Sequence, residues 1–274
     1  MIEVLVRLTL AFVVLLPVFA LLERAFPGVP GQRRLRRGFW TDVAYWFVSV
    51  PMSRVVAFAS ATVAVLVVAL PLGAPLSPDG LIDWLNRDTA ISRQPAWAQV
   101  VELLLLGDFI AYWMHRLFHR NSRLWPFHAV HHSSTDLDWL SSVRVHPVNE
   151  ALTTFAQFLP LLALGFRPGT LGPAAGILVL YAVFIHANLR WSFGPLRYII
   201  ATPVFHRWHH TSQEEGLDKN FAGFLPLWDL LFGTFYLPSG SQPTRFGIRG
   251  DSPPDGLGRQ LLYPFRGPTS RPAG

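Results

Sequence analysis

The sequence predicts an all-α, polytopic membrane protein with about four spanning or re-entrant helices and a helical cap on the cytoplasmic side. Composition is the first indication: 51% of the 274 residues are hydrophobic and 15% are charged, whereas about a quarter are charged in ordinary soluble domains. Several apolar stretches also approach or exceed the roughly 20 residues that cross a bilayer. Cysteine is absent, which excludes disulfides, iron–sulfur clusters and cysteine-ligated zinc.

The basic excess indicates membrane topology rather than nucleic-acid binding. The chain carries 23 Lys and Arg against 17 Asp and Glu. Arginines cluster at 33–37 and at 116–123, in both cases beside apolar segments, as the positive-inside bias predicts. They do not form the long basic stripe that is typical of a nucleic-acid surface. We therefore expect a membrane partner and no nucleic-acid partner.

Two apolar segments precede residue 73. Residues 2–22 are long enough to form the first span; a cleaved signal peptide is the alternative, but its basic start and its small-residue cleavage site are lacking. The stretch 40–72 is too long for one simple span and contains proline and arginine. We expect an interfacial piece around Trp46, followed by a span at about 55–70.

The remaining membrane segments follow a polar interruption. Residues 73–96 contain prolines, glycines and balanced charges, which predict a non-cytoplasmic loop. A helix over 97–118 would return the chain to the basic side. The apolar segments 151–165 and 173–189 flank the turn GFRPG and predict a helical hairpin that dips into or crosses the membrane.

Three regions result from this pattern. Residues 1–96 hold the N-terminal membrane helices and their loop. Residues 97–238 form a histidine-rich domain, in which 115–150 and 186–236 lie together on the cytoplasmic face. Residues 239–274 are rich in Pro, Gly, Ser and Arg and are expected to form a loosely ordered tail.

All ten histidines lie between residues 115 and 210, mostly in the boxes HRLFH, HAVHH and HRWHH. Residues spaced i, i+3 and i+4 share one helix face, and imidazole is a common ligand for iron, zinc, copper and nickel. Because a structural zinc takes only four ligands, so many imidazoles predict a dimetal site. Capping of the helix after Pro147 remains an equal alternative for His146. The expected metal ligands are His115, His119, His128, His131, His132, His146, His186, His206, His209 and His210.

The boxes and the residues around them resemble the fatty acid hydroxylase/sterol desaturase superfamily over about residues 97–238. The third box is followed by a D-x-N-[YF]-x-G element in which Phe221 replaces the more usual Tyr. The further matching residues are Asp108, Tyr112 and Trp113 before the first box, Arg144, His146 and Pro147 in an R-x-H-P element, His186 and Asn188 in an H-x-N element, Asp218, Asn220 and Gly223 after the third box, and the ending WDLLFGT at 228–234.

This resemblance implies a membrane-bound, non-haem di-iron oxygenase that hydroxylates or desaturates a lipid with O₂. The lipid would be a fatty acyl chain, a sterol, or a related isoprenoid or ether lipid. Two iron ions would be the cofactors, although purified protein can carry zinc or another metal instead. Electrons would come from a separate ferredoxin-, cytochrome b5- or flavoprotein-type donor. The scarcity of Lys relative to Arg indicates a bacterial source and hence the inner membrane, with the active site on its cytoplasmic face.

Three polar residues are candidates for supporting the ligands. We expect Asp108 to orient a histidine by accepting its second N–H, the alternative being a polar group that only packs the helix. We expect Asp218 and Asn220 to support the ligands or to close the loop after the third box.

Two other classes of function remain as alternatives. A histidine-rich metal-binding or transport protein without redox catalysis would distribute its ionisable residues along a pathway through the spans, whereas these histidines lie at helix ends. A hydrolase that uses metal-bound water would need an open metal position, which the number of imidazoles disfavours.

Overall fold

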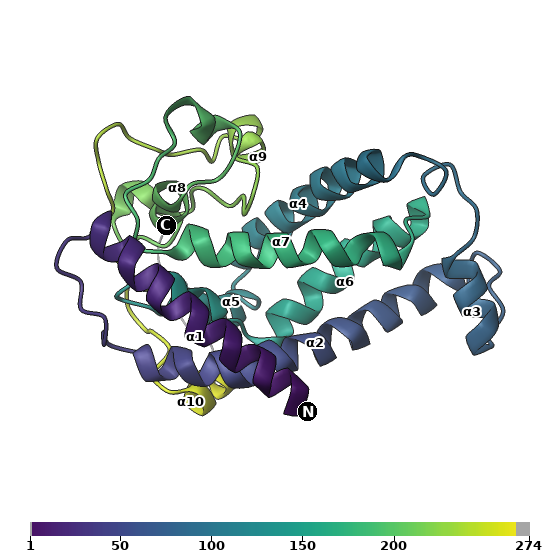
Figure 1. Cartoon of the computed structure of the whole chain (residues 1–274), viewed down its shortest axis with the longest axis horizontal. Coiled ribbons are helices and arrows are strands. Elements are labelled where there is room, and N and C mark those ends of the chain that lie inside the picture. Colours follow the sequence, from purple (N-terminus) through teal and green to yellow (C-terminus); the bar gives the residue numbers. More distant parts are fainter. Residues whose placement is uncertain (1, 267–274) are drawn as a thin grey trace.

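The computed structural model describes residues 2–266, and within that range the chain is helical (Figure 1). Those residues form no strand, only two isolated bridges, Pro27–Leu189 and Thr211–Phe246. The all-α prediction is thereby confirmed. The helices are α1 (Ile2–Ala25), α2 (Phe39–Ala69), α3 (Pro78–Leu85), α4 (Ala96–Arg120), α5 (Trp125–His132), η1 (Trp139–Val143), α6 (Pro147–Leu164), α7 (Pro168–His186), η2 (Gly194–Tyr198), α8 (Pro203–His209), η3 (Glu214–Gly216), α9 (Leu227–Leu231), α10 (Leu257–Leu262) and η4 (Tyr263–Phe265).

Three helices of the described chain, α1, α2 and α4, are long and apolar enough to cross a membrane. Their outer faces are strongly exposed: Leu10 on α1 is 60% exposed and Phe58 on α2 is 76% exposed. Large apolar side chains in such positions are stable against lipid and costly in water. These features are those of an integral membrane protein.

Helix α2 differs from the prediction, because it is one continuous helix of 31 residues that includes Pro51. At 1.5 Å per residue it is about 46 Å long, well beyond the roughly 30 Å of a hydrocarbon core. Its N-terminal half is buried against the rest of the protein at Thr41, Asp42, Tyr45 and Trp46. The expected division into a separate interfacial piece and a span is wrong: the helix is continuous, and its N-terminal half packs within the protein.

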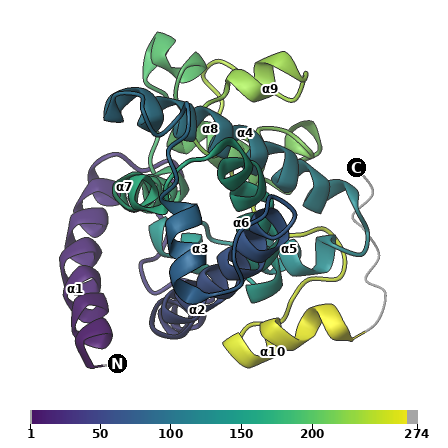
Figure 2. The same cartoon turned by 90° about the vertical axis from the view of Figure 1, so that its right-hand side faces the viewer.

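The loop and hairpin regions place α4 beside the later helices. The expected loop 73–96 contains the short helix α3, whose start is capped because Ser77 Oγ accepts from Gly80 N at 3.1 Å. Helices α6 and α7 are joined through Gly165, which ends α6 with φ 88°. Helix α2 packs along α6, and α4 contacts both α6 and α7. This arrangement brings the C-terminal end of α4 to α5 and that of α7 to α8 (Figures 1 and 2).

The segment 239–266, expected to be loosely ordered, is instead folded against the histidine-bearing part. Ser212 N donates to Arg245 O at 2.9 Å. Gln260 on α10 is fully buried, and its Nε2 donates to Ser133 Oγ at 3.2 Å. Helix α10 also contacts α2 (Figure 2). Side-chain anchors therefore order this segment despite its Pro- and Gly-rich composition; residues 267–274 lie outside the described residues.

Candidate metal centre

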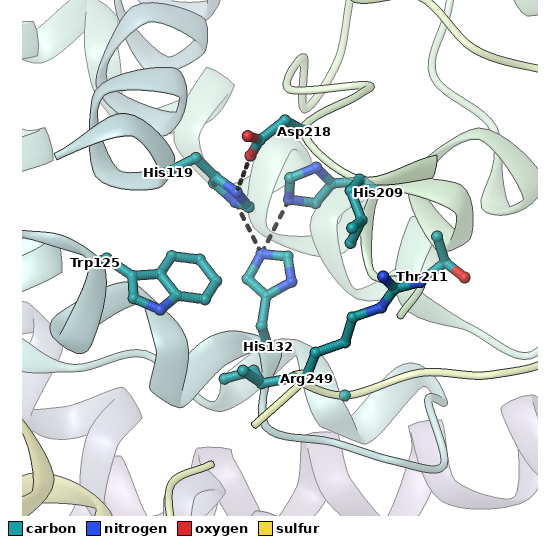
Figure 3. Close-up of a pocket in the computed structure, with 10 residues that line it drawn as sticks. His119, Trp125, His132, His209, Thr211, Asp218 and Arg249 are labelled. Carbon is teal, nitrogen blue, oxygen red and sulfur yellow. Dashed lines mark hydrogen bonds and ion pairs between the residues drawn. The ribbon is translucent and has the colours of Figure 1, made fainter. Parts of the chain in front are cut away.

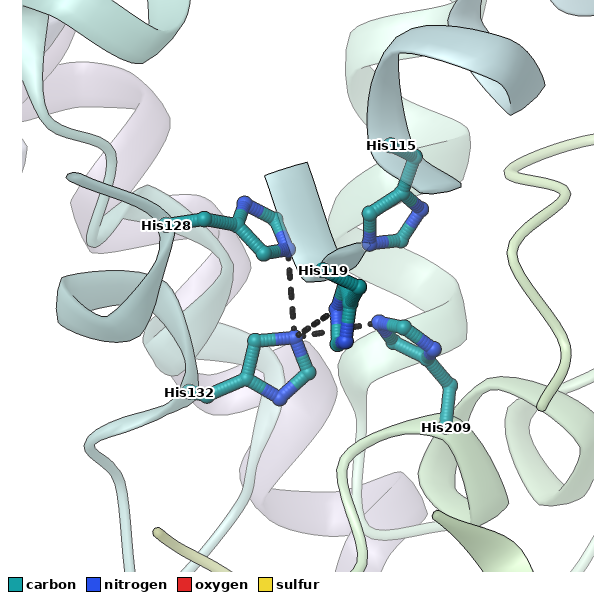
Figure 4. Close-up of side chains that lie close together, drawn as sticks. All are labelled: His115, His119, His128, His132 and His209. Atoms are coloured by element: carbon teal, nitrogen blue, oxygen red, sulfur yellow. Dashed lines mark hydrogen bonds between the residues drawn. The ribbon is translucent and has the colours of Figure 1, made fainter. Parts of the chain in front are cut away.

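Nine of the ten histidines gather into two compact groups in the interior. The ligand atoms within each group all lie within 4.8 Å of one another. Figure 4 shows the larger group, with its rings directed inward from several elements. The five-histidine group comprises His115, His119, His128, His132 and His209, and the four-histidine group comprises His131, His186, His206 and His210.

The boxes supply both groups because their spacing presents imidazoles on adjacent helix faces. The last turns of α4 carry His115 and His119, four residues apart, and both enter the five-histidine group. Helix α5 divides its ligands, since His131 and His132 are neighbours in sequence but belong to different groups. Helix α8 does the same at the third box, and α7 ends at His186.

Hydrogen bonds at Nδ1 fix the tautomer of several rings. Because a carbonyl oxygen only accepts, the Nδ1 atom facing it must carry the proton. In a neutral imidazole, Nε2 is then a lone-pair donor, the form that binds a metal. The backbone acceptors are Phe221 O for His115 at 2.6 Å, Lys219 O for His209 at 2.8 Å, Arg144 O for His131 at 3.2 Å and Ala182 O for His186 at 2.6 Å.

Side-chain oxygens receive two further Nδ1 atoms of the five-histidine group. His119 Nδ1 lies 3.2 Å from Asp218 Oδ1, and His128 Nδ1 lies 3.0 Å from Asn149 Oδ1. Asp218 thus lies within hydrogen-bond distance of a predicted ligand. Oriented in this way, both rings direct Nε2 toward the centre of their group.

The Nε2 atoms converge at distances that suit ligands around a shared cation. His132 Nε2 lies 3.1, 3.2 and 3.1 Å from the Nε2 atoms of His119, His128 and His209. His132 Nε2 can carry at most one proton, so it cannot form a hydrogen bond with all three of these nitrogens. Unprotonated nitrogens at such distances repel one another. With metal–nitrogen distances of about 2.1 Å, ligands at right angles lie about 3.0 Å apart. Among the described residues, His115 Nε2 is buried without a hydrogen-bond partner, so the group fits a metal.

The four-histidine group has the same geometry. His186 Nε2 lies 3.0 Å from His206 Nε2 and 3.2 Å from His131 Nε2. His210 Nε2 completes the set at 3.1 Å from His206 Nε2. An all-imidazole donor set suits iron, zinc, copper or nickel, so each group could hold one such ion.

Burial keeps these imidazoles neutral. Desolvation lowers the pKa of His132 and His209 well below the usual 6.5, and neighbouring histidines lower it further. The same causes lower the pKa of His206 and His210. Since a ligating imidazole must be unprotonated, the fold favours the metal-binding form before any cation arrives.

Among the predicted site residues outside both groups are His146 and Asp108. His146 is the N-cap of α6: its Nδ1 accepts from Val148 N at 3.1 Å and its Nε2 donates to Leu261 O at 3.1 Å. Both nitrogens thus make hydrogen bonds, and the capping alternative describes this residue.

Asp108 makes no hydrogen bond to a histidine among those described. It accepts from Phe224 N at 3.1 Å, Leu225 N at 2.8 Å and Trp228 Nε1 at 3.0 Å. The prediction that Asp108 orients a ligand is wrong, because the turn after the third box occupies its oxygens.

Asn220 makes hydrogen bonds that hold together the loop after the third box. Its Nδ2 donates to Phe205 O at 2.9 Å and to Tyr236 O at 2.7 Å, and its Oδ1 accepts from Tyr236 N at 2.7 Å. Asp218 and Asn220 both have left-handed backbones, with φ 54° and 58°. Asp and Asn tolerate this conformation better than most residues.

Sequence reasoning missed a buried charge network that adjoins the four-histidine group. Arg36 Nη2 donates to Asp42 Oδ2 at 2.6 Å, and Arg36 Nε donates to Asp138 Oδ2 at 2.6 Å. Arg144 also bonds Asp42, and its carbonyl accepts from His131. Within the basic run 33–37 only Arg36 is buried, and nothing in the composition of that run distinguishes it. The D-x-x-S capping box of Asp138 and Ser141 was the available signal.

A small cavity of about 40 Å³ opens beside the five-histidine group (Figure 3). Its wall includes His119, His132 and His209 together with Trp125 and Arg249. Asp218 also lines it and is about one-third exposed. One side of this group is therefore close to the protein surface.

Comparison with known proteins agrees with this geometry. The profile of the fatty acid hydroxylase family ("Fatty acid hydroxylase") matches residues 100–234. The chain is 33% identical over 171 residues to the ornithine lipid hydroxylase OlsE of Rhizobium tropici, covering 62% of this chain and 51% of that protein. It is 38% identical over 128 residues to the alkylglycerol monooxygenase of Homo sapiens, covering 47% and 28%.

A third relative broadens the range of named activities. The chain is 32% identical over 158 residues to the very-long-chain aldehyde decarbonylase GL1-7 of Oryza sativa subsp. japonica, covering 51% of this chain and 24% of that protein. The chain thus spans about half the length of these relatives or less. No solved structure matches it. Through residues 100–234, which contain all three histidine boxes, the chain belongs to the fatty acid hydroxylase family.

Proposed function

We propose that this protein is a membrane-bound di-iron oxygenase that hydroxylates or desaturates a lipid with O₂ and external electrons. The observation that carries the proposal is the convergence of nine imidazoles in two groups, several with Nδ1–H fixed by an oxygen acceptor. Relatives named as a lipid hydroxylase and a monooxygenase support the reaction class. The lipid would be a fatty acyl chain, a sterol, or a related isoprenoid or ether lipid.

The residues divide the work between binding and orientation. The nine grouped histidines would hold two iron ions, one in each group, and bound iron would supply the O₂ activation that cleavage of an unactivated C–H bond requires. Asp218 orients His119, and Asn220 shapes the loop beneath the five-histidine group. Seven of the nine grouped histidines are buried, which limits the access of bulk water to them. Within this scheme, residues 97–238 are the catalytic domain, residues 1–96 anchor it, and residues 239–274 flank it.

We further propose an inner-membrane location in a bacterium, with the metal groups on the cytoplasmic face. Arg33, Arg34, Arg120 and Arg123 are exposed near the ends of candidate spans, which agrees with the positive-inside bias. A separate ferredoxin-, cytochrome b5- or flavoprotein-type donor would deliver electrons there. The small cavity beside the five-histidine group supports this proposal, because it leaves one side of that group close to the protein surface.

Metal analysis combined with lipid analysis tests the proposal. We expect purified protein to hold about two irons per chain, and expressing cells grown under ¹⁸O₂ to accumulate either an ¹⁸O-labelled lipid or a lipid that has lost two hydrogens. His132→Ala should reduce bound metal and abolish the product, because His132 Nε2 adjoins three other ligands. His146→Ala is the matched control, since His146 lies outside both groups.

The outcomes separate the candidate classes. Full activity of a metal-stripped preparation would refute the oxygenase. Two bound metals with no O₂-dependent change in any lipid would identify a metal-binding protein without redox catalysis instead.

A further inference from the structure

Three of the five histidines in the larger group have their Nδ1 atom within hydrogen-bond distance of an oxygen in one short loop. Asp218 Oδ1 faces His119, Lys219 O accepts from His209, and Phe221 O accepts from His115. The four-histidine group draws its backbone acceptors from elsewhere, at Arg144 and Ala182. The loop 218–222 is thus a support specific to the five-histidine group.

The peptide planes of this loop are held from the side opposite the histidines. A peptide unit is rigid and planar, with its C=O and N–H on opposite edges. Phe221 O and Ala222 N belong to one unit, and Ala222 N donates to Asp229 Oδ2 at 2.8 Å. Fixing that N–H therefore fixes the direction of the carbonyl that receives His115.

The peptide unit whose carbonyl oxygen accepts from His209 is held in place by Thr234. Lys219 O and Asn220 N belong to one peptide unit, and Asn220 N donates to Thr234 O at 2.9 Å. Thr234 is in turn bound to Asp229: its Oγ1 donates to Asp229 Oδ1 at 2.6 Å, and its N donates to Asp229 O at 2.9 Å. Asp229 is completely buried, and its Oδ1 also accepts from Phe221 N at 2.8 Å.

We propose that Asp229, acting with Thr234, is a positioning residue that sets the metal affinity of the five-histidine group alone. It touches no histidine in these bonds and acts through two peptide planes. The inference rests on the proposed function, because it assigns one metal to each group. Loss of Asp229 should weaken one metal site and leave the other unchanged.

Asp108 provides a closely matched control. Like Asp229, it is a buried carboxylate that accepts from two successive backbone N–H groups and one side chain. Those N–H groups share their peptide units with Gly223 O and Phe224 O, and neither carbonyl accepts from a histidine in the described hydrogen bonds. Asp229→Asn and Asp108→Asn each place an amide NH₂ where a carboxylate oxygen accepted, so their effects on stability should be similar.

The experiment titrates full-length, metal-free protein in detergent with Zn²⁺ in competition with a chromophoric chelator, and it records the melting temperature of each variant. We expect two sites in the wild type and in Asp108→Asn. In Asp229→Asn we expect one site weakened by about 10–100-fold, the usual effect of removing an outer support of a metal ligand. Thr234→Val should weaken the same site, whereas Thr234→Ser should restore it by returning the hydroxyl.

Each alternative result is decisive. Unchanged affinities in Asp229→Asn, equal weakening of both sites, or the same loss in Asp108→Asn would overturn the inference while leaving the proposed function intact. If Asp229→Asn does not fold, the Thr234 pair decides: equal affinities for Val and Ser overturn it. A wild-type chain that binds no Zn²⁺ would refute the proposed function together with this inference.

Discussion

Histidines that are adjacent in the sequence belong to different groups in this protein, because their side chains lie on different faces of the same helix. His131 and His132 differ by one position on α5 and belong to separate groups. Box spacing made this convergence predictable, because i, i+3 and i+4 positions share a face. The acceptors at Nδ1 were not predictable in the same way: carbonyls such as Phe221 O exist at every residue and leave no mark in the sequence.

Acid should destabilise the metal-free protein through its buried histidines. Burial lowers their pKa below that of the unfolded chain, about 6.5, so the unfolded state binds more protons as pH falls. Stability is then fully present above about pH 6.5 and is lost below it, by up to about 1.4 kcal/mol per pH unit for each histidine. The groups concerned outside the spanning helices are His128, His131, His132, His206, His209 and His210.

Thermal unfolding of chelated protein in detergent measures this dependence. The melting temperature should be constant above about pH 7 and fall steadily toward about pH 5. Protein saturated with Zn²⁺ should fall less, because bound metal opposes protonation. A melting temperature independent of pH in the chelated protein would contradict the assignment of these imidazoles as neutral and buried.

At the scale of elements, α2 is held to the histidine-bearing part by charge as well as by apolar packing. Asp42 lies between Arg36 and Arg144 on the buried half of this helix, and all three side chains are almost completely inaccessible. Arg144 also links this network to the four-histidine group, because its carbonyl oxygen accepts a hydrogen bond from His131. The sequence predicted an apolar segment here but not its single-helix form, because the buried partners of its N-terminal half lie far away in the sequence.

Removing Asp42 should be costly. Asp42→Ala leaves two guanidinium groups buried with fewer partners, so we expect the free energy of unfolding to fall by about 3–5 kcal/mol. Asp255→Ala is the control: it breaks the exposed pair with Arg37, whose atoms are 2.9 Å apart, and should leave the melting temperature nearly unchanged. Comparable melting temperatures for the two variants would show that the Asp42 network adds little to stability.

At the scale of the whole molecule, the two histidine groups connect elements that are distant in sequence. Helices α4, α5, α7 and α8 each contribute ligands. The all-helical class, the candidate spans and the gathering of the boxes could be predicted, because composition and periodicity encode them directly. The folded state of residues 239–266 could not be predicted, because it depends on single side chains such as Gln260, which have little effect on the average composition of the segment.

Metal removal should therefore loosen the assembly as a whole. A ligand that binds only the folded state stabilises it by about 2.7 kcal/mol at 100 times its dissociation constant. We expect EDTA to lower the melting temperature of purified protein by several degrees and to increase proteolysis between α8 and α9. Restoration by Fe²⁺ or Zn²⁺ but not by Mg²⁺, which prefers oxygen ligands, would separate specific binding from a general salt effect. An identical melting temperature with and without EDTA would contradict this role.

The division of α5 and α8 between the two groups has a geometric consequence. Each short helix contributes histidines to both groups, so neither group can move relative to the other without distorting both helices. The geometry of α5 and that of α8 each fix the distance between the two groups, and this distance does not depend on loop length. Loops and cavity walls can thus vary while the separation between the two histidine groups stays constant.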